Sequence, residues 1–131
     1  MNLDPKKLYM MPLIMGPISD RNQGSQYEKV EMLSLQYKTN HEAVEALLPD
    51  CFKPADEPTV TIAFGFNDGV DFLLGRGYNV VIVLLAAKFL GEKDNLEGDY
   101  ALVIFENETH PIVTGREILG APKIFADIPS L

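Results

Sequence analysis

The part of this sequence best suited to chemistry lies between positions 115 and 128, where one lysine stands in a constrained, apolar setting. Lys123 directly follows Pro122, whose ring fixes its own backbone angle and favours an extended conformation before it. Ile124 and Phe125 come next, and side chains of both types favour burial. An amine held in a rigid, apolar environment loses its proton more readily and can then attack a carbonyl carbon. Lys123 is therefore a candidate nucleophile.

A nucleophilic lysine must be neutral. An ordinary lysine titrates near ~10.4, so less than ~0.1% of it is neutral at pH 7. Lowering that value by ~3 units requires about 4 kcal/mol of differential stabilisation. Desolvation supplies this energy, or a second cation nearby does. Arg116 is the cation that the sequence offers close by, although the distance between the two groups does not follow from the sequence.

The same stretch resembles the signature of the acetoacetate decarboxylase family. In that family a Gly-Arg-Glu run is followed, after a short turn, by Pro-Lys, and the lysine forms a Schiff base with a keto acid. The matching residues here are Gly115, Arg116, Glu117, Pro122 and Lys123. Weaker similarity covers residues 27–49, 57–66 and 97–117. The resemblance implies that the chain is the amino-terminal part of a longer protein whose carboxy-terminal part is absent.

Three departures from the family pattern concern the surroundings of the lysine. Ile124 stands where the decarboxylase often has a second lysine, and Ala63 stands where it has a glutamate. A second expected glutamate falls near Arg76 and Gly77, where there is no carboxylate. The loss of the second cation leaves desolvation as the main expected cause of activation. The lost carboxylates bear on the identity of the substrate more than on the chemistry of the lysine.

The resemblance implies a Schiff-base lyase acting on a small keto acid, with decarboxylation of acetoacetate or a related β-keto acid as the leading reaction. Lys123, Glu117 and Arg116 are the expected catalytic residues, and Arg76 and Glu108 the expected substrate-binding residues. Arg116 or Arg76 would hold the substrate carboxylate, and Glu117 or Glu108 would move protons. No cofactor and no metal is implied.

Three alternatives remain open. The family also contains aldolase-dehydratases that act on pyruvate-like acids through the same lysine. The chain could instead be a small-molecule-binding homologue that has lost turnover, which the missing carboxylates favour. It could also be a structural half-domain that another chain completes.

Composition limits the partners. A chain of 131 residues with 47% hydrophobic residues fits one domain with a real core. The net charge of −8 argues against nucleic acids and anionic membranes as partners. The single Cys51 forms no internal disulfide, and no signal peptide is visible, so we expect a cytoplasmic protein. The expected partners are a small keto-acid substrate and further copies of the chain, because uncovered sheet edges pair readily.

The hydrophobic pattern predicts a mainly β (α+β) fold. Residues 1–26 hold scattered proline and glycine, which indicates an extended amino-terminal arm, and residues 27–131 form the β domain. Alternating or apolar runs predict strands at 30–38, 59–66, 79–90, 99–106, 112–114 and 124–128. One short helix is expected near 40–48, with Thr39 and Glu42 as a capping box. Together these elements predict an antiparallel sheet or barrel of the acetoacetate decarboxylase type, in incomplete form.

Overall fold

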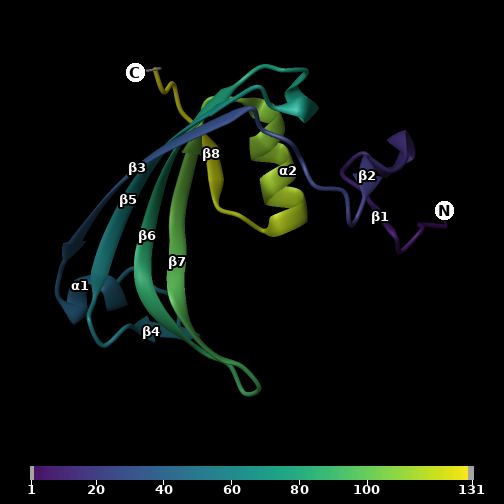
Figure 1. The fold of residues 1–131 in the computed structure, drawn as a ribbon. Coiled ribbons are helices and arrows are strands. Elements are labelled where there is room, and N and C mark those ends of the chain that lie inside the picture. The colour runs from purple at the N-terminus through teal and green to yellow at the C-terminus, as the bar shows by residue number, and fades with distance from the viewer. Residues whose placement is uncertain (1, 130–131) are drawn as a thin grey trace.

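A computed structural model describes residues 2–129 of the chain. A long, strongly curved sheet carries one helix against its concave side, and a small amino-terminal arm lies beyond that helix (Figure 1). The elements are β1 (Lys7–Leu8), η1 (Leu13–Met15), β2 (Ser19–Asp20), β3 (Lys29–Lys38), α1 (His41–Glu45), β4 (Phe52–Pro54), β5 (Thr59–Asp68), η2 (Asp71–Leu73), β6 (Tyr78–Leu90), β7 (Asn95–Glu106), α2 (Thr109–Leu119) and β8 (Lys123–Phe125).

The main sheet has the order β3-β5-β6-β7-β8, and β4 pairs with the far end of β6. The first four strands of this order pair antiparallel, as the alternating pattern predicts. The last pair, β7 with β8, is parallel. Helix α2 lies between the two strands in the chain and runs back along β7, so β8 enters the sheet in the same direction as β7. The sheet is mixed and open, so the predicted antiparallel sheet is confirmed except at β8.

The region after β7 differs from the prediction. Residues 112–114 were predicted to be a short strand, but they lie inside α2. The β-branched residues Ile112 and Val113 favour a strand locally, whereas the helix places Pro111, Ile112 and Gly115 together on its buried side. Gly120 then ends the helix in the left-handed conformation, at φ 66°. Burial of this helical face against the sheet outweighs the local preference for a strand.

The predicted helix near 40–48 is present in shortened form. Helix α1 spans His41–Glu45, and residues 46–48 continue as turns. Its cap is Asn40 rather than the predicted Thr39: the Asn40 side chain accepts a hydrogen bond of 2.8 Å from the backbone N–H of Ala43. The described residues thus contain two α-helices where the sequence predicted one.

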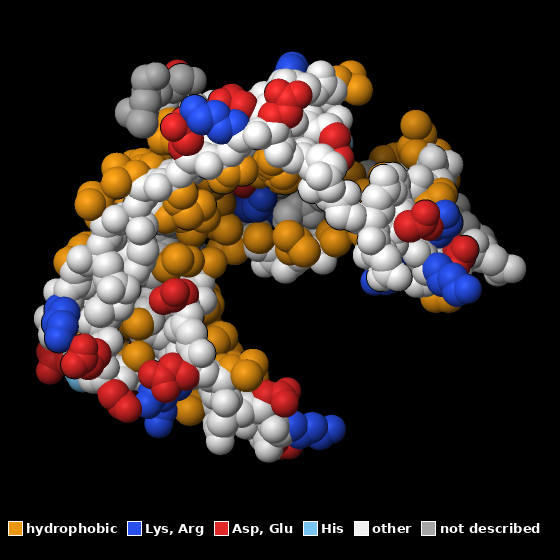
Figure 2. Space-filling model, in the orientation of Figure 1, with side chains coloured by type: hydrophobic (Ala, Val, Ile, Leu, Met, Phe, Trp, Pro, Cys, Tyr) orange, Lys and Arg blue, Asp and Glu red, His pale blue; other side chains and the backbone are white. Residues whose placement is uncertain are grey.

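The concave side of the sheet is lined with hydrophobic side chains (Figure 2). At the edge of the sheet, β3 pairs with β5, and all ten residues of β3 are exposed. The apolar residues of this strand that are more than half exposed are Val30, Met32, Leu33, Leu35 and Tyr37. β6 was predicted to be covered on both faces, but most of its residues are only half-buried. No helix within residues 2–129 is long and apolar enough to cross a membrane.

Candidate active site

Lys123 begins β8 and points its amine into the space between this strand, β7 and α2. The amine donates a hydrogen bond of 2.7 Å to Glu106 Oε1 and one of 3.1 Å to the backbone oxygen of Pro111. The Lys123 side chain is 13% exposed and that of Glu106 3%. The predicted apolar neighbours Ile124 and Phe125 are exposed instead. The amine is therefore buried through its partners on β7 and α2, not through the residues that follow it.

Gly115, the glycine of the Gly-Arg-Glu run, makes room for the lysine. A Cβ atom built on Gly115 would lie 2.4 Å from Lys123 Cε, 2.5 Å from Cδ and 2.8 Å from Nζ. The end of the lysine side chain therefore crosses α2 at the one point where the helix carries no side chain. Glycine lowers helix stability relative to alanine, so its presence here reflects the space that the lysine needs.

Glu106 is the partner of the lysine, and it was not among the predicted site residues. It is 2% exposed, and its second oxygen, Oε2, has no hydrogen-bond partner within residues 2–129. Coulomb attraction favours the charged forms of a lysine–glutamate pair, whereas burial favours their neutral forms. At 2.7 Å a proton can pass directly between the two groups. The structure thus provides a proton acceptor in direct contact with the lysine amine.

The position of Glu106 follows from the parallel pairing of β7 with β8. Ile104 is the register partner of Lys123, and Glu106 lies two residues further along the same strand. Side chains two residues apart on a strand point to one face of the sheet. Sequence reasoning missed Glu106 because it treated the residue only as the end of an apolar strand. A charged residue at that end was the one available signal.

The two other predicted catalytic residues both bond to backbone groups, but only Arg116 does so at the lysine. Arg116 Nη1 donates a hydrogen bond of 2.8 Å to the backbone oxygen of Lys123, which joins α2 to β8. Glu117 Oε2 accepts a hydrogen bond of 2.8 Å from the backbone N–H of Met11, which joins α2 to the amino-terminal arm. The structure thus brings Arg116 to Lys123 through the main chain, and it places the Glu117 carboxylate at the arm.

The two predicted substrate-binding residues pair with each other. Arg76 Nη1 lies 3.1 Å from Glu108 Oε2, and Arg76 Nε also donates to the backbone oxygen of Leu73. Glu108 is the residue directly before α2. This exposed pair links the loop after η2 to the start of α2, and neither residue is among the hydrogen-bond partners of the lysine amine.

Tyr78, at the start of β6, adds a neutral donor to this end of the sheet. Burial is the main cause that raises the pKa of its phenol, and the hydrogen bond with Tyr27 and the negative charge of Glu106 act in the same direction. The phenol therefore stays protonated at neutral pH. In the part of the chain that the structure describes, no three His, Cys, Asp or Glu side chains converge as metal ligands.

The chain matches a known family over almost its whole length. The family described as acetoacetate decarboxylase matches residues 10–130. The chain is 26% identical over 121 residues to Decarboxylase DEC1 of Cochliobolus heterostrophus, covering 90% of this chain and 44% of that protein. It is 31% identical over 100 residues to acetoacetate decarboxylase of Chromobacterium violaceum, covering 71% and 35%. The chain belongs to the acetoacetate decarboxylase family.

Solved structures agree with this assignment. Acetoacetate decarboxylase from Legionella pneumophila superposes with a TM-score of 0.63 at 25% identity, over 79% of this chain and 38% of that one. The enduracididine biosynthesis enzyme MppR shares the fold with a TM-score of 0.55 at 18% identity, over 73% and 38%. The predicted fold type is thereby confirmed. The chain spans less than half the length of each of these relatives.

Proposed function

We propose that this protein is a Schiff-base-forming lyase that acts on a small keto acid, with Lys123 as the nucleophile and Glu106 as its proton acceptor. The observation that supports this most directly is the buried contact of 2.7 Å between the lysine amine and the glutamate carboxylate. Family membership supports a decarboxylase-like enzyme. Acetoacetate or a related β-keto acid is the proposed substrate.

The proposed reaction begins when Glu106 takes a proton from the Lys123 ammonium group. The neutral amine adds to the ketone carbon to form a carbinolamine. Glu106 gives its proton to the carbinolamine hydroxyl, water leaves, and an iminium ion remains. The bond between the carboxylate carbon and the α-carbon then breaks, its electron pair moves toward the iminium nitrogen, and carbon dioxide leaves. A solvent proton then adds to the enamine carbon, and hydrolysis of the resulting iminium ion releases the ketone and restores the Lys123 ammonium group.

Trapping with sodium borohydride tests the nucleophile. With acetoacetate or pyruvate present, we expect a stable mass adduct that peptide mapping places on Lys123. Lys88 and Lys93 are the controls. Lys88 lies 2.7 Å from Asp56 Oδ2 at the surface, in an ion pair without the burial of Lys123. An adduct spread equally over the three lysines, or absent from Lys123, would contradict the proposal.

The Glu106→Gln substitution tests the proton acceptor, because it keeps the shape of the side chain and removes the base. If Glu106 accepts the proton, we expect trapping at neutral pH to slow by about 100-fold or more. If Glu106 only holds the lysine in its charged form, the same substitution should speed trapping, since the attraction that favours the ammonium ion is gone. Glu97→Gln, at an exposed ion pair with Lys88, is the matched control and should change nothing.

The main alternative is an aldolase-dehydratase that acts on pyruvate-like acids through the same lysine. The shared fold with MppR, which has been solved in complex with pyruvate, supports keeping it. The replacement of family residues by Ile124 and Ala63 also favours a different substrate. The two reactions differ in their products: the decarboxylase releases carbon dioxide from acetoacetate, whereas the alternative joins pyruvate to an aldehyde and releases water.

A further inference from the structure

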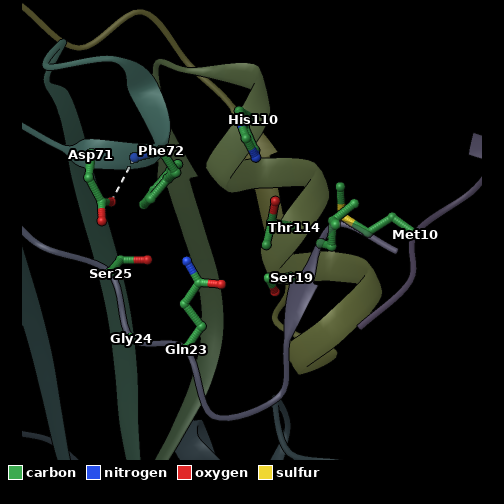
Figure 3. A pocket seen from close by; sticks show the side chains of 10 residues that line it. Met10, Ser19, Gln23, Gly24, Ser25, Asp71, Phe72, His110 and Thr114 are labelled. Carbon is green, nitrogen blue, oxygen red and sulfur yellow. Dashed lines mark hydrogen bonds between the residues drawn. The ribbon is translucent and has the colours of Figure 1, made fainter. Parts of the chain in front are cut away.

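A cavity lies along α2, next to the residues that contact the lysine side chain. It is partly open to solvent, has a volume of about 600 Å³, and is lined by residues of α2, of η2 and of the amino-terminal arm. In Figure 3, His110 and Thr114 project from α2, and Gln23 and Ser25 approach them from the arm. His110 and Thr114 are four residues apart, so they share one face of the helix. None of these four residues was singled out as a site residue by the sequence.

The cavity offers polar groups that the fold itself leaves unused. The Thr114 hydroxyl is buried and has no hydrogen-bond partner in the described part of the chain. An unpaired buried hydroxyl costs free energy, and a ligand that bonds to it recovers that cost. The His110 ring packs against Phe72 with ring centroids 5.2 Å apart, which fixes the apolar wall beside it.

The charges around the cavity favour an uncharged ligand group. No lysine or arginine is among the described residues that line it. Asp71 is the acidic residue of the lining, and its two oxygens already accept hydrogen bonds from the backbone N–H groups of Gln26, at 3.0 Å, and Phe72, at 2.6 Å. A carboxylate would find no fixed cation here. A hydroxyl or carbonyl group would find hydroxyl, amide and imidazole partners.

The cavity and the lysine share the same two turns of α2. Pro111, whose backbone oxygen accepts a hydrogen bond from the lysine amine, directly follows His110. Gly115, which makes room for the lysine side chain, directly follows Thr114. Consecutive helical residues point about 100° apart, so the cavity lines the helix face next to the one that the lysine crosses. The residues that line the cavity and the residues that contact the lysine are therefore direct neighbours on α2.

We propose that this cavity binds the uncharged, oxygen-bearing portion of the keto acid whose ketone reacts with Lys123, with Thr114 and His110 as specificity-determining residues. The inference rests on the proposed function and adds the class of substrate: a keto acid with a hydroxyl or carbonyl group beyond the reacting ketone. The cavity thus selects for the substrate group that the lysine does not touch.

Two probe acids that differ by one hydroxyl group test this directly: 4-hydroxy-2-oxopentanoate and 2-oxopentanoate. The chain has two histidines, so the ring protons of His110 report on the cavity by nuclear magnetic resonance while those of His41, on α1, serve as the internal control. We expect the hydroxy acid to shift the His110 signals saturably and to bind more tightly than 2-oxopentanoate. Thr114→Val should erase this preference, a change of about 2- to 10-fold, and Thr114→Ser should keep it.

Borohydride trapping of the same samples separates this inference from the proposed function. An adduct on Lys123 without a His110 response, with equal affinity for both acids, or with a preference that survives in Thr114→Val, overturns the role of the cavity and leaves the reaction standing. A His110 response that depends on Thr114, without an adduct on Lys123, supports the cavity as a binding site and overturns the reaction. If both measurements are negative, both proposals fail.

Discussion

Replacement of Lys123 by methionine is expected to abolish borohydride trapping and to lower the free energy of unfolding by about 3–5 kcal/mol. Methionine fills most of the same volume, so lost packing contributes little. The large term comes from Glu106, which is 2% exposed and would keep a buried charge without a partner. Urea unfolding followed by circular dichroism measures the loss.

The double variant Lys123→Met, Glu106→Gln separates stability from chemistry. It removes the stranded charge, so most of the stability should return, because replacing both partners of a buried ion pair is often nearly neutral. Trapping should remain absent, because the nucleophile is gone. A Lys123→Met protein as stable as the natural chain at neutral pH would show that Glu106 is not a buried charge in solution.

Gly115→Ala is expected to slow trapping at Lys123 by about 100-fold while the fold stays intact. The new methyl group would occupy the space of Lys123 Cδ and Cε, and the flexible end of the lysine can move away from it. That movement breaks the 2.7 Å contact with Glu106, and a displacement of about 1 Å is enough for a loss of this size. The free energy of unfolding should also fall, because the buried Glu106 carboxylate loses its partner, although alanine favours the helix by about 0.5–1 kcal/mol and offsets part of that loss.

Gly98→Ala is the matched control for this prediction. Gly98 lies on β7, and a Cβ atom added there meets nothing within 4 Å. It should leave both trapping and unfolding close to those of the natural chain. If Gly115→Ala traps substrate as fast as the natural chain does, the reactive position of the lysine is not the one that crosses α2 at this glycine.

The sequence by itself determined the elements whose residues alternate and the identity of the lysine. β3 and β5 could be predicted because successive side chains of a strand point to opposite faces of the sheet. The alternation of apolar and polar residues that results is visible within each strand's own sequence. The Gly-Arg-Glu and Pro-Lys runs led to the family and to Lys123 because they are short, contiguous patterns. Both kinds of signal lie within a few residues of the chain.

The tertiary structure alone decided the partner of the lysine. Glu106 and Lys123 are 17 residues apart, and they meet because α2 intervenes and turns β8 parallel to β7. The sequence predicted a strand at 112–114 and therefore missed the helical connection. The β-branched residues there favour a strand locally, whereas the free energy that stabilises the helix comes from burying one of its faces against the sheet. The hydrogen bond from Arg116 to the backbone of Lys123 and the contact of Glu117 with Met11 likewise depend on how α2 packs against β8 and the amino-terminal arm. Local pattern carries no information on docking, because the free energy that determines it comes from contacts between distant segments.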